Sequence, residues 1–294
     1  GGASMGLNIV FGIDTTTAAA ISGILGILLF VSPKMGGVLD NTAKVLGTVM
    51  LVLIGYVAFS TNPPVAEAAT HALVPTNYPW LATITLIGGT VGGYITFSGG
   101  HRLIDAGITG REHLKDVRRA AFMGMSVDAI VRILLFLAVL GVVSMGFVLD
   151  PKDPAGSAFL LGAGEIGHKL FGIVFFCAAL TSVVGAAYTS VSFLKTLFKV
   201  VERYEKLTIM AFIFVSTCIL IFIGKPATLL IVAGSVNGLI LPVTLAVMLL
   251  ATRKTNIVGD YKHNPVLFYT GWIVVLVTAY IGVTSLQGIV KLLG

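Results

Sequence analysis

The stretch GGTVGGYITFSGGHRLIDAG, residues 88–107, places three glycine pairs beside His101, Arg102 and Asp105 in an otherwise apolar run. Glycine costs about 1 kcal/mol relative to alanine in a helix interior, so this glycine content disfavours one continuous helix. The segment Ser98–His101 combines a polar residue, two glycines and an imidazole. This composition predicts an unwound segment. For the earlier glycines the expected role is close helix packing, and these are Gly88, Gly89, Gly92 and Gly93.

The composition is that of a membrane protein. The 294 residues are 56% hydrophobic and 11% charged, with a mean hydropathy of +0.99. Soluble domains carry about 25% charged residues, so a soluble globular domain is excluded. Apolar runs of roughly 20 residues recur, and each is long enough to cross a bilayer core of about 30 Å. We expect an all-α polytopic membrane protein with eight spans, near residues 15–31, 43–60, 80–108, 119–149, 166–195, 207–223, 227–252 and 266–292.

Basic residues collect in alternate loops. Fourteen of the 19 Lys and Arg residues lie in the loops that follow the first, third, fifth and seventh spans. Because short cytoplasmic loops retain Lys and Arg, these loops are predicted to face the cytoplasm. The first residue then faces outside, and an odd number of preceding spans would restore a cytoplasmic start. We therefore expect a multi-pass protein of the bacterial cytoplasmic (inner) membrane that lacks its N-terminal helices here.

The expected partners follow from this placement. The net charge of +6 is no nucleic-acid signal, because the basic residues lie between spans. We expect contact with the lipid bilayer and with a transported cation or small solute, with protons as a further candidate, and no obligate protein partner. The sequence contains no P-loop, ATP-binding motif or nucleophile–base constellation, so neither a cofactor nor an enzymatic activity is expected.

A break inside a membrane helix is a candidate binding site. It exposes backbone N–H and C=O groups, which the membrane tolerates only where the segment is buried in protein or lines a watery cavity. Secondary transporters build their substrate sites at such breaks. We predict substrate or ion binding at Ser98, Gly99, Gly100 and His101. The imidazole of His101 can change protonation near neutral pH, which would suit a role linked to protons or substrate. A structural hydrogen bond is the alternative role for this residue.

For other polar residues inside the spans, structural roles are expected beside functional ones. Arg102 and Asp105 can pair on one helix face as an interfacial salt bridge, with gating or proton transfer as the alternative. Asp128 and Arg132, four residues apart, are predicted to form a structural ion pair. Asn237 puts a polar side chain in the seventh span, where substrate binding and packing are both open.

Three further groups are expected to be structural. Glu165 and His168 suit a solvated helix start, and Pro242 suits a kink. A stripe of small and hydroxylated residues in the fifth span suits helix packing, and it comprises Thr181, Ser182, Gly185, Thr189 and Ser192. The two cysteines, Cys177 and Cys218, lie far apart in apolar runs and are expected to be buried small hydrophobes.

Several motifs together resemble a known transporter family. The glycine-rich stretch with FGID, FSTNPPV, RILLFLAVLGVVS, GAAYTSVSF, FIGKP, NGLILP and IVGDYKH resembles bacterial NRAMP-like permeases. These form a divergent branch of the natural-resistance-associated macrophage protein family of divalent metal transporters. The resemblance implies a LeuT-like inverted repeat of eleven spans, of which spans four to eleven are present. Residues 15–60 would be the last two helices of the first repeat, 80–252 the second repeat and 266–292 the additional C-terminal helix.

The resemblance also implies a site. In typical members the broken helix reads Met-Pro-His, and the methionine sulfur binds a transition metal. The aligned residues here are Gly99, Gly100 and His101, so Gly99 replaces the methionine, and Thr96 falls where a backbone carbonyl ligand is expected. Oxygen-only sites suit harder ions than sulfur sites do. Glycine also widens the site for a hydrated ion or a small organic solute.

The function implied is secondary active transport of divalent metal cations, by alternating access around the break at residues 96–101. Symport with protons is the implied coupling. Two alternatives stay open: a permease for a small organic solute on the same fold, and a fragment without activity of its own.

Overall fold

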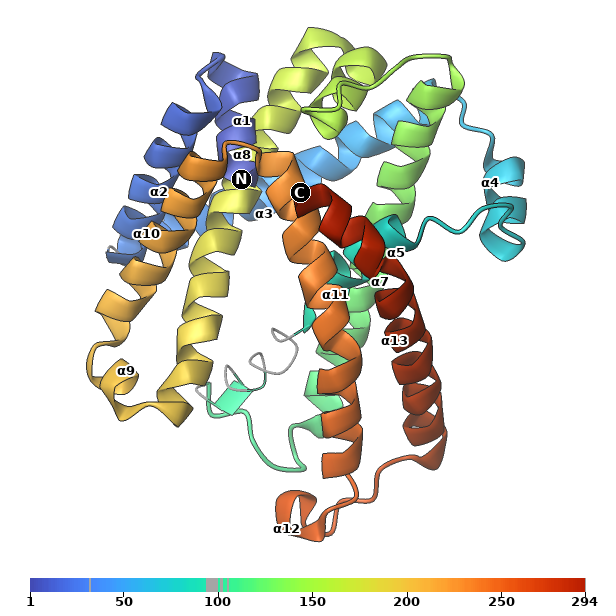
Figure 1. Cartoon of the computed structure of the whole chain (residues 1–294). Helices are drawn as coiled ribbons and strands as arrows, with labels where there is room; N and C mark the ends of the chain where they lie inside the picture. The colour runs from blue at the N-terminus through green and yellow to red at the C-terminus, as the bar shows by residue number, and fades with distance from the viewer. Residues whose placement is uncertain (32, 94–99, 101–102, 105, 294) are drawn as a thin grey trace. The chain divides into compact units, whose positions relative to one another are not determined.

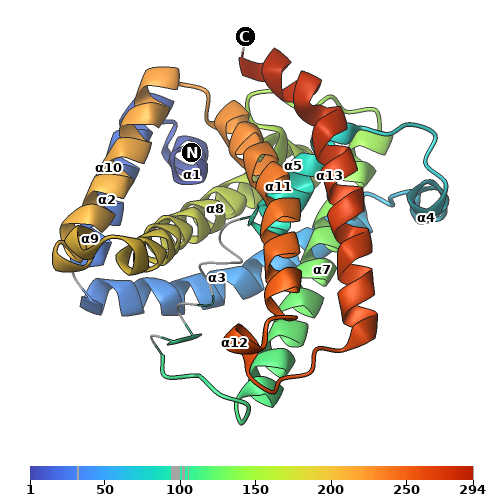
Figure 2. The same cartoon turned by 60° about the horizontal axis from the view of Figure 1, so that its bottom comes forward.

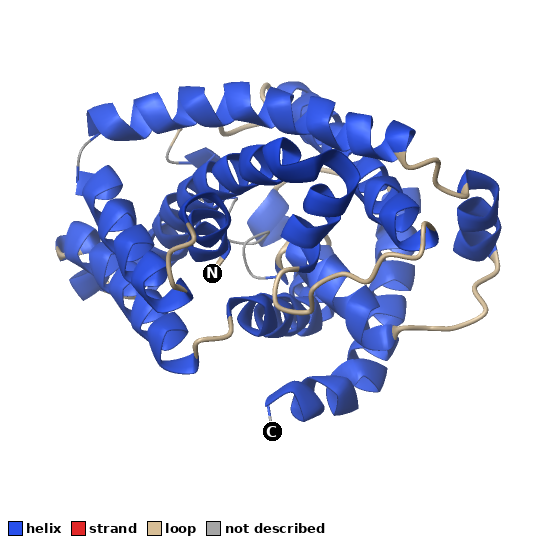
Figure 3. Cartoon of the chain, turned by 90° about the horizontal axis from the view of Figure 1, so that it is seen from above, coloured by secondary structure: helices blue, strands red, loops and turns tan. Residues whose placement is uncertain are grey.

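The computed structural model describes residues 1–31, 33–93, 100, 103–104 and 106–293. Over these residues the chain is helical, with turns and loops between helices and no strand (Figure 3). The all-α prediction is therefore confirmed. The chain divides into two compact units (Figure 1): Gly1–Thr76 with Ile104–Ala227, and Asn77–Leu103 with Thr228–Gly294. We call them unit 1 and unit 2.

Unit 1 holds most of the helices. They are α1 (Gly2–Phe11), α2 (Thr15–Val31), α3 (Pro33–Ser60), α4 (Val65–Leu73), α7 (Leu114–Ser144), α8 (Pro154–Leu197), α9 (Lys199–Arg203) and α10 (Glu205–Ile223). Unit 2 contains α5 (Trp80–Val91), nearly all of α11 (Pro226–Ala251), α12 (Thr255–Val258) and α13 (Pro265–Leu293).

Helix lengths agree with a multi-pass membrane protein. Among the described residues, five helices are long and apolar enough to cross a bilayer: α7, α8, α10, α11 and α13. Two bent pairs raise this number to seven if each pair is one span, namely α1 with α2 (118°) and Val45–Ser60 with α4 (102°). Seven of the eight predicted spans correspond to these candidates. The predicted third span, 80–108, is represented by α5, which has only 12 residues.

Several predicted boundaries shift for local reasons. Helix α8 begins at Pro154 rather than near residue 166, because the carboxylate of Asp153 accepts a 2.9 Å hydrogen bond from the Gly156 N–H and caps the helix. It then kinks at Gly164 (φ 66°, ψ −169°), close to the predicted start. Helix α7 begins and ends five residues earlier than predicted, and left-handed Gly146 (φ 88°) follows it. Helix α4 was not predicted.

The core of unit 1 lies where α3, α7 and α8 meet. Phe159 of α8 is 1% exposed and stacks on Phe171 with their ring centroids 4.5 Å apart. Ile54 and Val57 of α3 and Val142 of α7 complete the centre of this cluster. A second cluster joins α8 to α10, so α8 lies between α3 and α10 (Figure 2). Helix α8 is therefore the element on which unit 1 is assembled.

The end of α8 is tied to the start of α10 by an ion pair. Lys195 Nζ lies 3.0 Å from Glu205 Oε1, and both side chains are partly buried. The short helix α9 occupies the turn between them. This contact closes the hairpin that α8 and α10 form.

Truncation of the core aromatic tests this assembly. We expect Phe159→Ala to destabilise the protein by about 3 kcal/mol, because a buried phenyl ring is replaced by a cavity. The measurement is the thermal unfolding midpoint in detergent. Phe222→Ala on α10 is the matched control, since that ring is 87% exposed. Equal midpoints for the two variants would contradict the assignment of this core.

Candidate functional site: the end of α5 and its contact with α11

Aromatic contacts hold the first turn of α5 in unit 2. The Trp80 ring stacks on Tyr78 with centroids 5.2 Å apart. It also meets Tyr280 of α13 edge-on at 5.6 Å. Leu81 lies against Gly288, which is eight residues after Tyr280 in α13. The start of α5 is therefore anchored on α13.

Helix α5 stops inside the apolar run. Gly92 adopts the left-handed conformation (φ 68°, ψ 61°), and its N–H donates to the carbonyl of Gly88 at 3.0 Å. Only glycine takes this conformation without steric cost. Twelve residues span about 18 Å, a little over half of a 30 Å bilayer core. The helix therefore ends partway across a membrane, and it ends before the predicted break at residues 96–101.

Backbone contact between α5 and α11 determines where this end lies. The position of a β-carbon at Gly88 is occupied by the carbonyl of Gly234 and the backbone of Gly238. One turn earlier, Thr85 Oγ1 and Ser235 Oγ share a 2.7 Å hydrogen bond, and Ser235 is fully buried. We call Gly88, Gly234, Gly238, Thr85 and Ser235 the glycine seam. Small side chains at these positions allow the two helices to approach closely.

The four glycines expected to pack have three different roles. Gly88 and Gly93 are packing positions, because Gly93 lies directly against the carbonyl of Asn237. Gly92 instead ends the helix, and Gly89 has open space where its side chain would be. The packing interpretation thus holds for Gly88 and Gly93 and not for Gly89.

Sequence reasoning missed the α11 side of the seam. Gly234 and Gly238 are four residues apart within GSVNG, and this spacing puts them on one helix face. A small residue repeated at this interval in an apolar helix is a helix-packing signal. From sequence alone, only Asn237 and Pro242 of this stretch are predicted to have a role.

The seam also places carbonyl oxygens near the end of α5. Pro242 is buried inside α11 and has no N–H, so it cannot donate to the carbonyl of Gly238 four residues earlier. Asn237, the neighbour of Gly238, is half-buried and carries an amide oxygen. The C-terminal end of α5 has a partial negative charge from the helix dipole, and no basic residue lies in its last turn. This end therefore attracts a cation.

Most of the predicted binding residues lie outside the described part of the chain: Thr96, Ser98, Gly99, His101, Arg102 and Asp105. Gly100 is described and helical, with open space at its β-carbon position. Leu103 and Ile104 are helical too, and Gly107 (φ 71°) follows with a 2.9 Å hydrogen bond to the Ile104 carbonyl. Asn237 is described beside the seam.

Comparison with known proteins identifies the family. Residues 1–287 match the profile described as natural resistance-associated macrophage protein-like, Nramp. The chain belongs to the Nramp family. It is 49% identical over 286 residues to the uncharacterized membrane protein YcsG of Bacillus subtilis (strain 168), covering 97% of this chain and 71% of that protein. It is 50% identical over 279 residues to an uncharacterized membrane protein of Haemophilus influenzae (strain ATCC 51907 / DSM 11121 / KW20 / Rd), covering 95% and 70%.

Membership of the Nramp family makes the chain a multi-pass membrane transporter rather than an enzyme in the usual sense. The relatives carry no assigned substrate in their names. Within the described residues, no group of three His, Cys, Asp or Glu side chains could hold a metal ion. In the described part of this Nramp chain, the possible metal ligands near α5 are therefore backbone carbonyl oxygens and the amide oxygen of Asn237.

The predicted structural groups are found in unit 1. Arg132 Nε lies 2.7 Å from Asp128 Oδ2 in α7. Glu165 is exposed directly after the Gly164 kink, and His168 is half-buried, as at a solvated helix start.

The small-residue stripe packs as expected in its second half. Thr189 and Ser192 are buried, and the Thr189 hydroxyl donates to the Gly185 carbonyl at 2.8 Å. Cys177 is a buried free thiol, whereas Cys218 is only half-buried. Both positions are compatible with packing roles.

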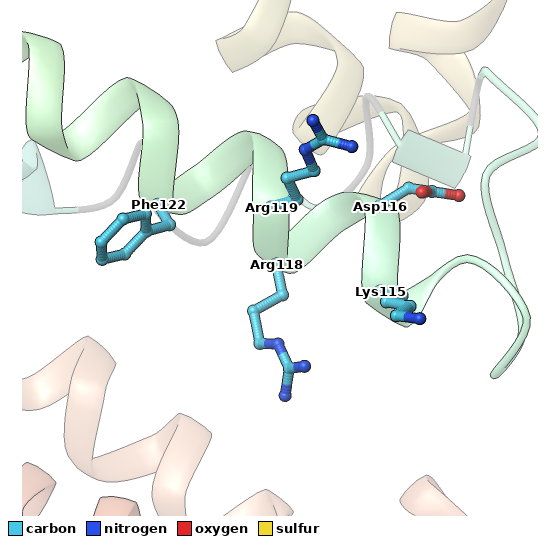
Figure 4. A pocket seen from close by; sticks show the side chains of 5 residues that line it. All are labelled: Lys115, Asp116, Arg118, Arg119 and Phe122. Carbon is cyan, nitrogen blue, oxygen red and sulfur yellow. The ribbon is translucent and has the colours of Figure 1, made fainter.

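A concave surface of the Nramp chain lies at the start of α7. A cavity of about 590 Å³ is lined by Lys115, Asp116, Arg118, Arg119 and Phe122 (Figure 4). Three cations against one carboxylate disfavour a cation site here. This basic end instead marks the membrane interface that the loop charges assign to the cytoplasm.

The glycine seam can be tested by adding side chains to adjacent glycines. We expect Gly88→Leu to prevent α5 from seating on α11, because the new side chain meets backbone that cannot move aside. Gly89→Leu, one residue away, meets open space and is expected to fold normally. The measurement is the yield of monodisperse protein by size-exclusion chromatography in detergent. If both variants behave like the parent, α5 and α11 are not in backbone contact.

Proposed function

We propose that this Nramp-family protein is a secondary active transporter of divalent metal cations in the bacterial cytoplasmic membrane. It works by alternating access around the break that follows α5, in symport with protons. Residues 80–252 act as the second repeat, residues 15–60 as the end of the first, and 266–292 as an additional helix.

One observation carries the proposal: α5 ends at Gly92, partway through a span. The negative end of a half-helix near the midplane is how transporters of this architecture coordinate cations. The last turn of α5 has no basic side chain that would neutralise this end. The glycine seam gives the half-helix a fixed support, so that its end can act as a preformed part of a site.

The proposed ligands are oxygen atoms, with one imidazole. They are the carbonyl of Thr96, the backbone and side chain of Ser98 through His101, and the amide of Asn237. His101, Arg102 and Asp105 are the proposed proton-linked or gating residues. Oxygen ligands favour hard cations such as Mg²⁺ or Mn²⁺ over softer transition metals.

The second candidate is a permease for a small organic solute. Two observations favour it: Gly99 stands where a methionine is usual, and the described residues hold no cluster of three metal-ligating side chains. Uptake by the protein in liposomes, measured in parallel for Mn²⁺, Mg²⁺ and radiolabelled organic acids, separates the two. Accumulation of an organic acid alone would replace the cation proposal, and no uptake of any substrate would indicate an inactive fragment.

Asn237 is the described ligand that can be tested most directly. We expect Asn237→Ala to lower cation uptake roughly tenfold, the scale of losing one group that holds a metal. Val236→Ala is the matched control, since this neighbour is apolar and 44% exposed. Uptake is measured at equal amounts of folded protein. Equal uptake by the two variants would remove Asn237 from the site.

Two substitutions test the ligand set after α5. Gly99→Met introduces a soft thioether, so we expect the ratio of Mn²⁺ to Mg²⁺ uptake to rise. His101→Ala is expected to reduce uptake and to flatten its dependence on pH between 5 and 8, because the imidazole titrates there. Both are measured in liposomes with an imposed pH gradient. If both variants transport like the parent, the ligand set is wrong.

A further inference from the structure

The turn between α11 and α13 is held in one conformation by its own hydrogen bonds. Gly259 ends α12 with a positive φ of 58°, and its N–H donates to the Thr255 carbonyl at 2.8 Å. The side-chain oxygen of Asn264 accepts a 2.8 Å hydrogen bond from the Val266 N–H and so caps the start of α13. The side chains that this turn carries are therefore presented from a defined backbone.

The position of this turn in a membrane follows from the two helices that it joins. Helices α11 and α13 are both long and apolar enough to cross a bilayer, and α12 lies at the end where the chain passes from one to the other (Figure 1). Leu249, near the end of α11, lies against Gly271 of α13. Residues 252–264 are turns and one short helix, a backbone that hydrocarbon does not tolerate, so this segment lies at the membrane surface. The loop charges predict that this is the cytoplasmic surface.

A cavity of about 440 Å³ in this turn has a basic lining. Its polar and basic side chains come from Thr252, Arg253, Thr255, Tyr261, Lys262 and His263. The described residues that line it include no carboxylate, and Asp260, the one acidic residue of segment 252–264, is not among them. A concave surface with this balance of charge attracts an anion.

The two cations of the lining are free to bind an anion. The guanidinium carbon of Arg253 lies over the Phe268 ring, 4.2 Å from its centroid, so the first turn of α13 positions this side chain. A ring contact uses none of the five N–H donors of a guanidinium. Neither Arg253 nor Lys262 forms an ion pair or a side-chain hydrogen bond with another described residue. Such donors suit the oxygen atoms of a phosphate group.

Exposed apolar residues beside the cavity favour a lipid as the source of the phosphate. Ile257, Val266 and Leu267 belong to α12 and the start of α13, and they are 65%, 65% and 59% exposed. A free phosphate ion would gain nothing from these side chains, whereas the acyl chains of a phospholipid would cover them. Basic residues close to a cytoplasmic membrane surface also attract anionic lipids.

We propose that the cavity at the α11–α13 turn binds the phosphate group of an anionic phospholipid, with Arg253 and Lys262 as its charged donors. The headgroup occupies the basic cavity, and the acyl chains run past the exposed apolar residues at the start of α13. The bound lipid links the end of α11 to the start of α13, because the two cations lie on either side of α12. Binding at this site is independent of the nature of the transported substrate.

Lipid binding in a neutral detergent tests this site. Native mass spectrometry of the protein titrated with dioctanoyl phosphatidylglycerol gives the affinity. We expect Arg253→Gln combined with Lys262→Gln to weaken binding roughly tenfold or more, because two cations beside the phosphate are lost. The matched control is Arg203→Gln combined with Lys206→Gln. It changes the net charge equally at another turn and also removes an arginine that lies over an aromatic ring, and it is expected to bind like the parent.

The single variant Lys262→Gln keeps the ring contact of Arg253, so it reports on the site even if the double variant does not fold. We expect it to bind severalfold more weakly than Lys206→Gln. Equal affinity of the matched variants for the lipid would overturn the site.

Two further ligands separate the possible sources of the anion. Dioctanoyl phosphatidylcholine, whose phosphate is balanced by a choline cation, is expected to bind more weakly to the parent. Equal binding of this lipid would reject selection by charge. We expect phosphatidylglycerol, and not millimolar inorganic phosphate, to raise the thermal unfolding midpoint by several degrees. An equal rise with inorganic phosphate would identify a free anion as the ligand and reject the lipid.

Discussion

Backbone contact between α5 and α11 is the constraint on which the candidate site depends. In a bilayer, apolar side chains gain little from meeting each other, because lipid tails are equally apolar. Association then relies on close van der Waals packing and on hydrogen bonds between helices. Gly88 against Gly234 and Gly238 supplies the first, and the Thr85–Ser235 hydrogen bond supplies the second. This half-helix of 12 residues has a further support at its start, where Trp80 meets Tyr280 of α13.

This support explains how a broken helix can be tolerated. A membrane tolerates the end of a helix within a span only where protein or a watery cavity surrounds it. The contacts of the seam reach the last turn of α5 at Gly88, so they set the position of the negative end of the α5 dipole. Pro242 adds a carbonyl that its own helix cannot satisfy, at Gly238 on the same seam. The glycines therefore bring the end of α5 at Gly92 close to the part of α11 that Pro242 interrupts, and backbone oxygen atoms gather there.

Hydropathy predicted the helical class and seven of the spans, because both depend on the thickness of a bilayer. The four-residue spacing of Asp128 and Arg132 predicted that they pair, because such residues share one helix face. Neither signal could predict where α5 ends. The left-handed conformation that ends α5 is at Gly92, six residues before the segment Ser98–His101 whose composition predicts an unwound stretch. Nor could a count of apolar residues reveal α4, or show which of four similar glycines touches another helix. Those outcomes depend on tertiary contacts, although the GSVNG spacing carried a signal for the seam.

The charged pair on α7 shows what helix spacing predicts and what it leaves open. Asp128 and Arg132 are four residues apart, and they share one hydrogen bond of 2.7 Å. Spacing along one helix could not predict where on α7 the core of unit 1 begins. Val131 packs against that core, whereas a β-carbon at Gly124 would have no heavy atom within 4 Å. The core along α7 therefore begins beside the ion pair, where the apolar residues around and after Arg132 pack against α3 and α8.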